Sequence, residues 1–409
     1  MCGVIVVILS LVVLLVSSLL LISFKPRHYD LLDVSSRKAI DSVMPQTGDG
    51  GNLVTTFTDM GEMYDRLLLD IADARQHVHL QFFKYEADAM GQHLGSLLVS
   101  KAAEGVSCRL MYDALMCRSW RWYYRELSLR GVQTAGFGRL CFRGSDYYRN
   151  HRKAVVIDGH VAYVGGVNIA ERYLHGLDWG SWRDTIIRIE GPAALAVQRA
   201  FVADWHYASG YLLAQPECFP AVPATGQLPV RILTSGPIGD GETILDYTVS
   251  MLDSAENYIW FQSPYFIPPA RLFEAMQRAA RRGVDVRVLL PPRGDRGETT
   301  QLASKSYFAC ALEMGIKICL YQPGYMHSKV VVCDDRVAMV GSCNIDPRSY
   351  RLCEEIAAVV ESADYAQGMR SVFLDDESES HPITAEEWQA RPARQKIGEA
   401  MARLIAPLL

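Results

Sequence analysis

The chain has 409 residues, 49% of them hydrophobic, and a formal net charge of -5 at pH 7. This length exceeds the usual size of one compact domain, so we expect two domains, each with its own core. The slightly acidic charge, without a long run of Lys and Arg, disfavours a nucleic-acid partner, because binding a polyanion requires a basic surface.

The N-terminal segment from Val4 to Phe24 contains no charged residue. As a helix it would reach about 30 Å, one bilayer core, so the sequence predicts a single transmembrane anchor over residues 1–27. A cleaved signal peptide is the alternative, but the run is longer than the apolar part of a signal peptide and lacks a small-x-small cleavage site. Lys25 and Arg27 follow directly, which predicts a cytoplasmic location for the rest of the chain.

After the anchor, residues 28–52 mix charges with Gly and Pro and are predicted to form a linker. Two units follow, at residues 53–214 and 228–375, and a Pro-containing stretch separates them. A C-terminal tail over residues 376–409 ends the chain. We therefore expect an anchor, a linker, two domains and a tail.

The two units resemble each other. Residues 69–83 and 250–264 each read as the end of an amphipathic helix that turns into a strand. Later in each unit a helix is predicted to end at a glycine, Gly105 or Gly283, and an apolar strand follows. The recurring order of strand, helix and strand predicts a duplicated α/β fold.

Ten cysteines are scattered singly, without a Cys-x-x-Cys pair. Such spacing forms neither a zinc nor a redox motif, and we expect no metal ion and no cofactor. Several cysteines lie in apolar runs, as Cys319 does, which is typical of small buried side chains in a reducing compartment.

Two segments are candidates for membrane contact. Residues 119–125 combine aromatic side chains with arginines, although an amphipathic helix packed on the first domain is an equally good interpretation. The tail places apolar side chains on one helical face, and this stripe could lie on a membrane or dock on the second domain. The residues of the stripe are Ile397, Met401, Leu404, Ile405 and Leu408.

One pattern occurs twice with identical spacing, once in each unit. A single copy could arise by chance, but two copies at corresponding points of a duplicated unit indicate a function. The residues are His151, Lys153, Asp158, Gly165, Gly166 and Asn168 in the first unit, and His327, Lys329, Asp334, Gly341, Ser342 and Asn344 in the second.

The pattern suits chemistry on a phosphate. A His and a Lys two residues apart on a strand point to the same face, so both can converge on one anion. The apolar runs that follow each Lys, with turns at Asp158-Gly159 and Asp334-Asp335, predict a hairpin that holds these groups at fixed separations. Lys and Asn can bind phosphate oxygens, and a His with a pKa of about 6.5 can act as nucleophile, acid or base near neutrality.

The twin pattern resembles the phospholipase D superfamily. The resemblance implies paired α/β/α domains with pseudo-twofold symmetry, whose two motifs meet at one site. It also implies that one His attacks phosphorus to form a phosphohistidine while the other is the acid and base, with no metal ion. On this resemblance His151 is the nucleophile and His327 the acid and base, and these roles could be reversed.

Shorter motifs are similar to those of bacterial cardiolipin synthases. They are Trp182-Arg183-Asp184, Ser235-Gly236-Pro237, residues 263–268, residues 321–327, and Glu355 after Arg348-Ser349-Tyr350. Many such synthases begin with two spanning helices, whereas this chain offers one. Where they carry Asn-x-Glu, this chain has Cys353-Glu354-Glu355.

The resemblance implies transfer of a phosphatidyl group from one phosphatidylglycerol to another, with release of glycerol, at the bacterial inner membrane. The implied partners are a phospholipid substrate and the membrane. By the same resemblance the His, Lys and Asp of both motifs are catalytic, and Asp184 and Glu355 orient the histidines. The residues expected to bind the substrate are Asn168, Asn344, Gly166 and Ser342.

Several alternatives remain at this point. A phospholipase D hydrolase would use the same residues with water as acceptor, and a phosphatidylserine synthase of the superfamily would use serine. A nuclease of the superfamily is disfavoured by the predicted anchor and the lack of basic runs, and an inactive scaffold is disfavoured because both motifs are intact. The sequence does not predict the oligomeric state.

Overall fold

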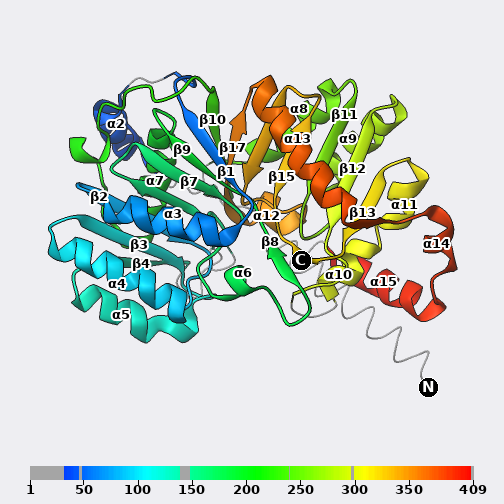
Figure 1. Ribbon diagram of the computed structural model, residues 1–409, viewed down its shortest axis with the longest axis horizontal. Coiled ribbons are helices and arrows are strands. Elements are labelled where there is room, and N and C mark those ends of the chain that lie inside the picture. The colour runs from blue at the N-terminus through cyan, green and yellow to red at the C-terminus, as the bar shows by residue number, and fades with distance from the viewer. Residues whose placement is uncertain (1–31, 46–47, 139–147, 239, 296–298, 407–409) are drawn as a thin grey trace.

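The computed structural model describes residues 32–45, 48–138, 148–238, 240–295 and 299–406. The predicted anchor lies outside these ranges. Of the helices within them, none combines the length and the hydropathy that a bilayer crossing requires. The described residues form two similar halves that lie side by side (Figure 1).

The first half is built on one mixed sheet with strand order β1-β9-β7-β6-β2-β3-β4. β2, β3 and β4 are parallel, and β6 runs antiparallel to β2. The strands are β1 (Leu53–Phe57), β2 (His77–Phe82), β3 (Ser107–Asp113), β4 (Gln133–Phe137), β6 (Ala154–Ile157), β7 (Val161–Gly165) and β9 (Ile186–Glu190). The helices are α3 (Met60–Ala72), α4 (Ala89–Ala103), α5 (Arg121–Leu129), α6 (Arg172–His175) and α7 (Ala194–Ser209).

The second half repeats this order as β10-β17-β16-β15-β11-β12-β13, with β18 added beside β13. Its strands are β10 (Val230–Ser235), β11 (Tyr258–Gln262), β12 (Asp285–Leu290), β13 (Lys317–Tyr321), β15 (Val330–Cys333), β16 (Val337–Gly341), β17 (Cys353–Val360) and β18 (Ser380–Pro382). Its helices are α8 (Thr243–Ser254), α9 (Ala270–Arg281), α10 (Thr299–Lys305), α11 (Phe308–Glu313), α12 (Pro347–Arg351), α13 (Ala363–Ser378), α14 (Ala385–Ala390) and α15 (Ala393–Ile405). The shared strand order confirms the predicted duplication.

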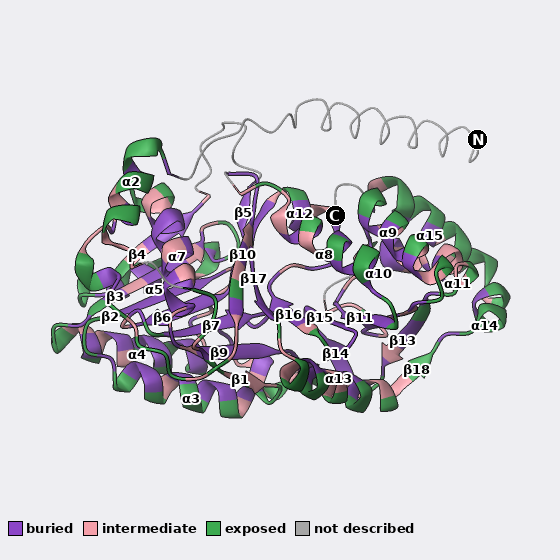
Figure 2. Cartoon of the chain, turned by 90° about the horizontal axis from the view of Figure 1, so that it is seen from above, coloured by how far each residue is buried: buried purple, intermediate pink, exposed green. Residues whose placement is uncertain are grey.

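Between the halves, the inner faces of the two sheets share one apolar core with α7 and α13. Figure 2 shows the buried strands of both sheets in the interior, with helices exposed on the outside. The core includes Val156, Val164 and Ile187 from the first half and Val332, Val340 and Ile356 from the second, all without exposed surface. Because this burial removes apolar surface of both sheets from water, it holds the halves in a fixed relation.

The predicted hairpins are present in both halves. β6 and β7 are joined through Asp158 and Gly159, whose φ angles are 51° and 73°. β15 and β16 are joined through Asp334 and Asp335, both with φ of 53°. Two central residues with positive φ form the turn that matches the twist of paired strands, and aspartate tolerates this conformation better than most residues.

Some predicted boundaries differ from the elements of the structure. The linker at residues 28–52 contains a helix, α2 (Val34–Val43), and the Asp33 carboxylate caps it by accepting from the backbone N–H of Ser36. The boundary at residue 375 falls inside α13, and β18 of the tail extends the second sheet by pairing with β13. The tail is therefore largely part of the second half.

Candidate active site

The two halves exchange short strands immediately before each histidine. β5 (Arg149–Asn150) of the first half pairs in parallel with β17 of the second. β14 (Gly324–Met326) of the second half pairs in parallel with β8 (Ser181–Arg183) of the first. The backbone N–H of His151 continues the first pairing by donating to the Glu354 carbonyl at 2.9 Å, and that of His327 donates to the Arg183 carbonyl at 2.7 Å.

Each histidine is bound by a carboxylate from the opposite half. His151 Nδ1 lies 2.8 Å from Glu355 Oε1, and His327 Nδ1 lies 2.6 Å from Asp184 Oδ2. Both carboxylates are fully buried, whereas the imidazole side chains keep 12% and 13% of their surface exposed. Because Nδ1 faces the carboxylate, Nε2 is the nitrogen left to act on a substrate.

The motif lysines lie beside these imidazoles. Lys153 Nζ donates to the His151 carbonyl at 2.5 Å, and Lys329 Nζ donates to the carbonyl of His327. Burial lowers the pKa of Lys153 to about 7 and that of Lys329 to about 8. A bound phosphate anion would favour the charged form of both groups.

The histidines are neutral at pH 7 in the free protein. Burial lowers the pKa of His151 to about 4, and both motif lysines add to this shift. Burial also lowers the pKa of His327 to about 4, again with a contribution from the two lysines. Since each histidine is bonded to the opposite half both at Nδ1 and at its backbone N–H, the structure brings the two motifs together at one site.

The two acids are ionised in this setting. Burial by itself would raise the pKa of Asp184, but the pairing of Asp184 with His327 Nδ1 and the charge of Lys329 outweigh it and lower that pKa. Burial opposes ionisation of Glu355 in the same way, and His151 and Lys153 outweigh it. Each carboxylate can therefore orient its imidazole and stabilise an imidazolium.

Gly166 and Ser342, expected to bind the substrate, lie against the two carboxylates. A Cβ atom on Gly166 would be 2.2 Å from Asp184 Oδ1, so only glycine leaves room for that acid. The Ser342 hydroxyl donates to Glu355 Oε2 and accepts a bond from the backbone N–H of Ile356 at 3.0 Å. Gly166 thus makes room for Asp184, whereas Ser342 binds Glu355 through a hydrogen bond.

The asparagines of the motif are buried near the ends of the hairpins. Asn168 Oδ1 accepts from the backbone N–H of Lys84 at 2.9 Å, and its Nδ2 lies 3.3 Å from the Tyr173 hydroxyl. In the second half, the buried Oδ1 of Asn344 has no hydrogen-bond partner among the described residues. Buried polar atoms are normally satisfied, which makes Asn344 Oδ1 a candidate to accept a hydrogen bond from a donor group of a ligand.

The structure does not bring Asp158 and Asp334 to the imidazoles. The Asp158 carboxylate accepts bonds of 2.7–2.8 Å from the backbone N–H groups of residues 75–77. The Asp334 carboxylate accepts three bonds of 2.8 Å from residues 256–258. Each aspartate follows its histidine by seven positions, with β6 or β15 between them, and at about 3.3 Å per residue this extended stretch spans roughly 20 Å.

Aromatic rings line both histidines. The ring of Phe83 makes an edge contact with His151, with centroids 4.7 Å apart, and lies 5.2 Å from Lys153 Nζ. The ring of Trp182 lies 4.8 Å from that of His327, and Trp182 Nε1 donates to Asp184 Oδ2 at 3.4 Å. These rings lower the local dielectric constant, which strengthens the interactions of the site.

A buried arginine stabilises each strand exchange, and sequence reasoning identified neither. Arg152, the middle residue of the first motif, is 1% exposed and donates to both oxygens of Asp204 at 2.9 Å. It also reaches Glu354 at 3.0 Å and Asp240 at 2.9 Å. Glu354, which occupies the variable middle position of Cys353-Glu354-Glu355, is therefore a partner of Arg152.

In the second strand exchange, between β14 and β8, the arginine lies on β8 and not in the motif. Arg183 binds Asp376 through two bonds of 2.7 and 2.8 Å, while Ser328 occupies the middle position of the motif. Asp204 lies on α7 and Asp376 on α13, in equivalent places of the duplicated fold. An acid within an apolar helix, as in Phe201-Val202-Ala203-Asp204, is the sequence signal that could have revealed these pairs.

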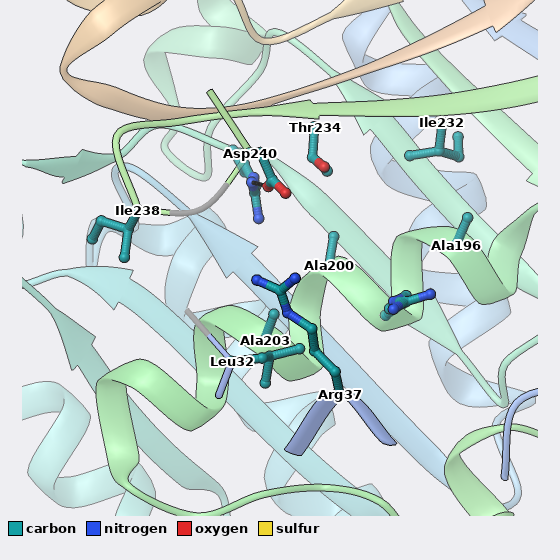
Figure 3. Close-up of a pocket in the computed structure, with 11 residues that line it drawn as sticks. Leu32, Arg37, Ala196, Ala200, Ala203, Ile232, Thr234, Ile238 and Asp240 are labelled. Carbon is teal, nitrogen blue, oxygen red and sulfur yellow. Dashed lines mark hydrogen bonds and ion pairs between the residues drawn. The ribbon is translucent and has the colours of Figure 1, made fainter. Parts of the chain in front are cut away.

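A cavity of about 290 Å³ lies beside Arg152, between α2, α7 and β10. In Figure 3 the Arg37 side chain extends into it toward Asp240, and alanines of α7 form one wall. Neither motif histidine lines this cavity, so it is separate from the imidazole site. In the described ranges, no cluster of His, Cys, Asp and Glu is arranged to hold a metal ion.

Comparisons with known proteins agree with the duplicated architecture. A family model described as "Cardiolipin synthase, PLD-like domain" matches residues 67–205 and 248–376, one stretch in each half. The major cardiolipin synthase ClsA of Bacillus subtilis (strain 168) is 38% identical over 366 residues, 88% of this chain and 76% of that protein. A cardiolipin synthase of Geobacillus thermodenitrificans (strain NG80-2) is 38% identical over 362 residues, 86% of this chain and 71% of that protein.

Among solved structures, the crystal structure of a phosphatidylserine synthase from Haemophilus influenzae Rd KW20 is similar in fold. Its TM-score is 0.68 at 14% sequence identity, and the match covers 91% of this chain and 100% of that chain. At this identity the likeness shows the fold alone. From the family match and the close relatives, the chain belongs to the cardiolipin synthase family of PLD-like proteins.

Proposed function

We propose that this protein is a cardiolipin synthase, which transfers a phosphatidyl group from one phosphatidylglycerol to another and releases glycerol. The observation that carries the proposal is the pair of imidazoles, each bound at Nδ1 by a buried carboxylate from the opposite half. Two such groups facing one phosphodiester can supply a nucleophile and a proton donor at the same time.

In the first step, Nε2 of one histidine, assigned to His151 by family resemblance, attacks the phosphorus of phosphatidylglycerol. The bond from phosphorus to the glycerol oxygen breaks, and that oxygen takes a proton from the imidazolium of His327. The products are a phosphohistidine and free glycerol. Because His327 is neutral in the free protein, it must gain its proton as the anionic substrate binds, which raises its pKa.

In the second step, a hydroxyl group of another phosphatidylglycerol gives its proton to neutral His327 and attacks the phosphohistidine. The nitrogen–phosphorus bond breaks, cardiolipin forms and His151 is regenerated. The Asp184 carboxylate, 2.6 Å from His327 Nδ1, stabilises the imidazolium of His327 whenever it forms. Atoms and charge balance without a further reactant.

Lys153 and Lys329 are proposed to balance the charge of the phosphate oxygens as negative charge builds on them. Asn168 and Asn344 are proposed to donate amide hydrogen bonds to the same oxygens. For Asp158 and Asp334 the backbone bonds described above support a role in holding the hairpins, rather than a role in proton transfer.

The lipid substrate stays in a bilayer, and residues 4–24 are proposed to anchor the chain there. The uncharged apolar composition of this segment supports the assignment, and Lys25 and Arg27 favour a cytoplasmic side for the catalytic halves. The proposed location is the bacterial inner membrane, with one spanning segment.

The test supplies the full-length protein with phosphatidylglycerol in detergent and identifies the products by mass. Cardiolipin with an equal amount of glycerol supports the transferase. Phosphatidic acid with glycerol would instead identify a hydrolase and overturn the proposal. Addition of serine distinguishes the third candidate, since a phosphatidylserine synthase would make phosphatidylserine.

His151→Ala and His327→Ala should each abolish turnover while circular dichroism shows an unchanged fold. His381→Ala is the matched control, because this histidine lies on exposed β18 and pairs with Glu387. Turnover by either motif variant would defeat the two-histidine mechanism.

A further inference from the structure

Helix α15 presents an apolar face to solvent. Its small residues Ala402 and Ala406 are buried in a cluster with Ile267 and Ala303, so this side of the helix docks on the second half. On the other side Ile397 is 61% exposed, Met401 60% and Leu404 45%. From the sequence, this stripe could either dock on the second domain or lie on a membrane. In the structure, one face of the helix docks on the second half and the opposite face is exposed to solvent.

The charges around this uncovered face are basic. Arg394, Lys396 and Arg403 are exposed along α15. The acid of the helix, Glu399, is 2% exposed and is paired with Arg391 at 2.8 Å. An apolar stripe bordered by Lys and Arg is the composition of helices that lie in the interface of an anionic bilayer.

The first half carries a second patch of the same kind, before and at the start of α5. Leu115, Met116 and Trp122 are 38%, 40% and 56% exposed. The exposed side chains of Arg118 and Arg121 lie among them in the chain. Tyr123 and Tyr124 of the same helix are buried in the first half, which orients the helix and leaves Trp122 outside.

Both patches lie at the edge of the sheets that carries the histidines. The Leu115–Trp122 segment follows the end of β3, and Cys117 Sγ there contacts the carbonyl of Phe83, whose ring touches His151. In the second half, α15 packs on α10 beside Ile267, which follows the end of β11. Figure 1 shows α5 and α15 at opposite ends of the lower side of the molecule, with α6 and β8 between them.

We propose that this edge docks on an anionic phospholipid bilayer through the two patches, with Trp122 and Met401 entering the interface. This orientation turns the imidazole site toward the surface from which lipid headgroups must come. The proposal rests on the proposed function, since it assumes a lipid substrate. The partner is a lipid surface because the charged side chains that lie among the apolar ones are basic and the apolar side chains include Trp and Met. The exposed acid one turn beyond Trp122, Glu126, is paired with Arg130 at 3.4 Å.

The first test measures contact directly. The full-length protein is reconstituted in vesicles that contain brominated acyl chains, of either phosphatidylglycerol or phosphatidylcholine, and its tryptophan fluorescence is compared with that of Trp122→Phe. The fluorescence of Trp122 is obtained by subtracting the spectrum of Trp122→Phe from that of the wild type. Brominated lipid should quench this fluorescence, and more strongly in the anionic vesicles. An unquenched Trp122, or equal quenching in both lipids, would overturn the proposal.

The second test separates docking from chemistry. The variants Trp122→Glu and Ile397→Glu/Met401→Glu should lower turnover of vesicle phosphatidylglycerol by about tenfold, since charge replaces apolar contact with the interface. Both should keep wild-type turnover of a short-chain phosphatidylglycerol that is dispersed as monomers. Leu69→Glu is the matched control, because Leu69 is a 59% exposed residue of α3 outside both patches.

Unchanged vesicle turnover, or equal losses on vesicles and monomers, would contradict the docking surface. A wild-type protein that converts neither substrate would defeat the proposed function instead, while the quenching of Trp122 would still decide whether the edge meets the bilayer. Quenching abolished by excess of a second copy of the chain would identify a protein interface and also overturn the proposal.

Discussion

Replacing Asp184 by Asn tests the coupling between the halves most directly. The Asp184 carboxylate accepts from His327 Nδ1 at 2.6 Å, from Thr185 N at 2.9 Å and from Trp182 Nε1 at 3.4 Å. Each oxygen thus faces at least one donor, so either orientation of an amide would place its NH₂ against another N–H. The change removes the negative charge and also creates a buried clash of donors.

The size of the effect follows from these contacts. A hydrogen bond to a charged partner contributes about 1.5–3 kcal/mol. Since about 1.4 kcal/mol of barrier is a factor of ten in rate, Asp184→Asn should lower kcat by about 10- to 150-fold. The donor clash favours the upper part of this range. KM should change little, because Asp184 is buried behind the imidazole.

The assay is the release of glycerol and of cardiolipin under single-turnover conditions, which separates the two chemical steps. Glu355→Gln is the symmetric comparison, and Asp178→Asn, which alters an exposed acid, is the control. If His327 is the acid and base, Asp184→Asn should slow both steps. A kcat within about twofold of the wild type would refute the role of the buried carboxylate.

Three further predictions concern residues of the repeated motif. kcat/KM should fall as the pH rises from about 7 to about 8, because Lys153 and Lys329 of the free enzyme lose their protons in this range. At saturating substrate, kcat should persist to higher pH, because the bound phosphate favours the protonated lysines. Gly166→Ala should lower kcat at least about tenfold, since its Cβ would meet Asp184 Oδ1 at 2.2 Å. Asp158→Asn should lower the free energy of unfolding by about 1–3 kcal/mol in a urea titration and leave kcat nearly unchanged, because its carboxylate binds only backbone N–H groups and lies far from the imidazoles.

A specific result would contradict each of these predictions. A kcat/KM that stays level up to about pH 9 would show that the lysine charges are not needed in the free enzyme. Gly368→Ala, at an open position of α13, is the control for Gly166→Ala and should leave both activity and stability intact. A large loss of kcat in folded Asp158→Asn would give that aspartate a catalytic role.

Much of the fold could be predicted because its signals are local. The hairpins at residues 154–165 and 330–341 were predicted from apolar runs around an aspartate turn, and the structure has them with positive φ at the turn. The helix ends at Gly105 and Gly283 were predicted in the same way, and both glycines have positive φ, 93° and 88°. Repetition of such local patterns was enough to predict the duplication.

The rest depends on contacts between distant parts of the chain. The pairing of His151 with Glu355 spans 204 positions and that of His327 with Asp184 spans 143, so no local pattern encodes which acid meets which histidine. Arg152 and Arg183 stabilise the two strand exchanges in the same way, but they do not occupy equivalent positions of the two repeats. A comparison of the repeats therefore does not reveal their common role. Helix α2 was missed because its stretch is polar and short.

The exchange of strands β5 and β14 has a consequence for how the protein is made. A ribosome completes the first half, with His151, long before it reaches Glu355, and a chain at that stage carries His151 without the carboxylate that binds its Nδ1. Catalytic competence thus arrives late in synthesis, when the second half has folded against the first. A chain that ends before residue 355 therefore lacks the partner acid of His151, whatever the state of its first half.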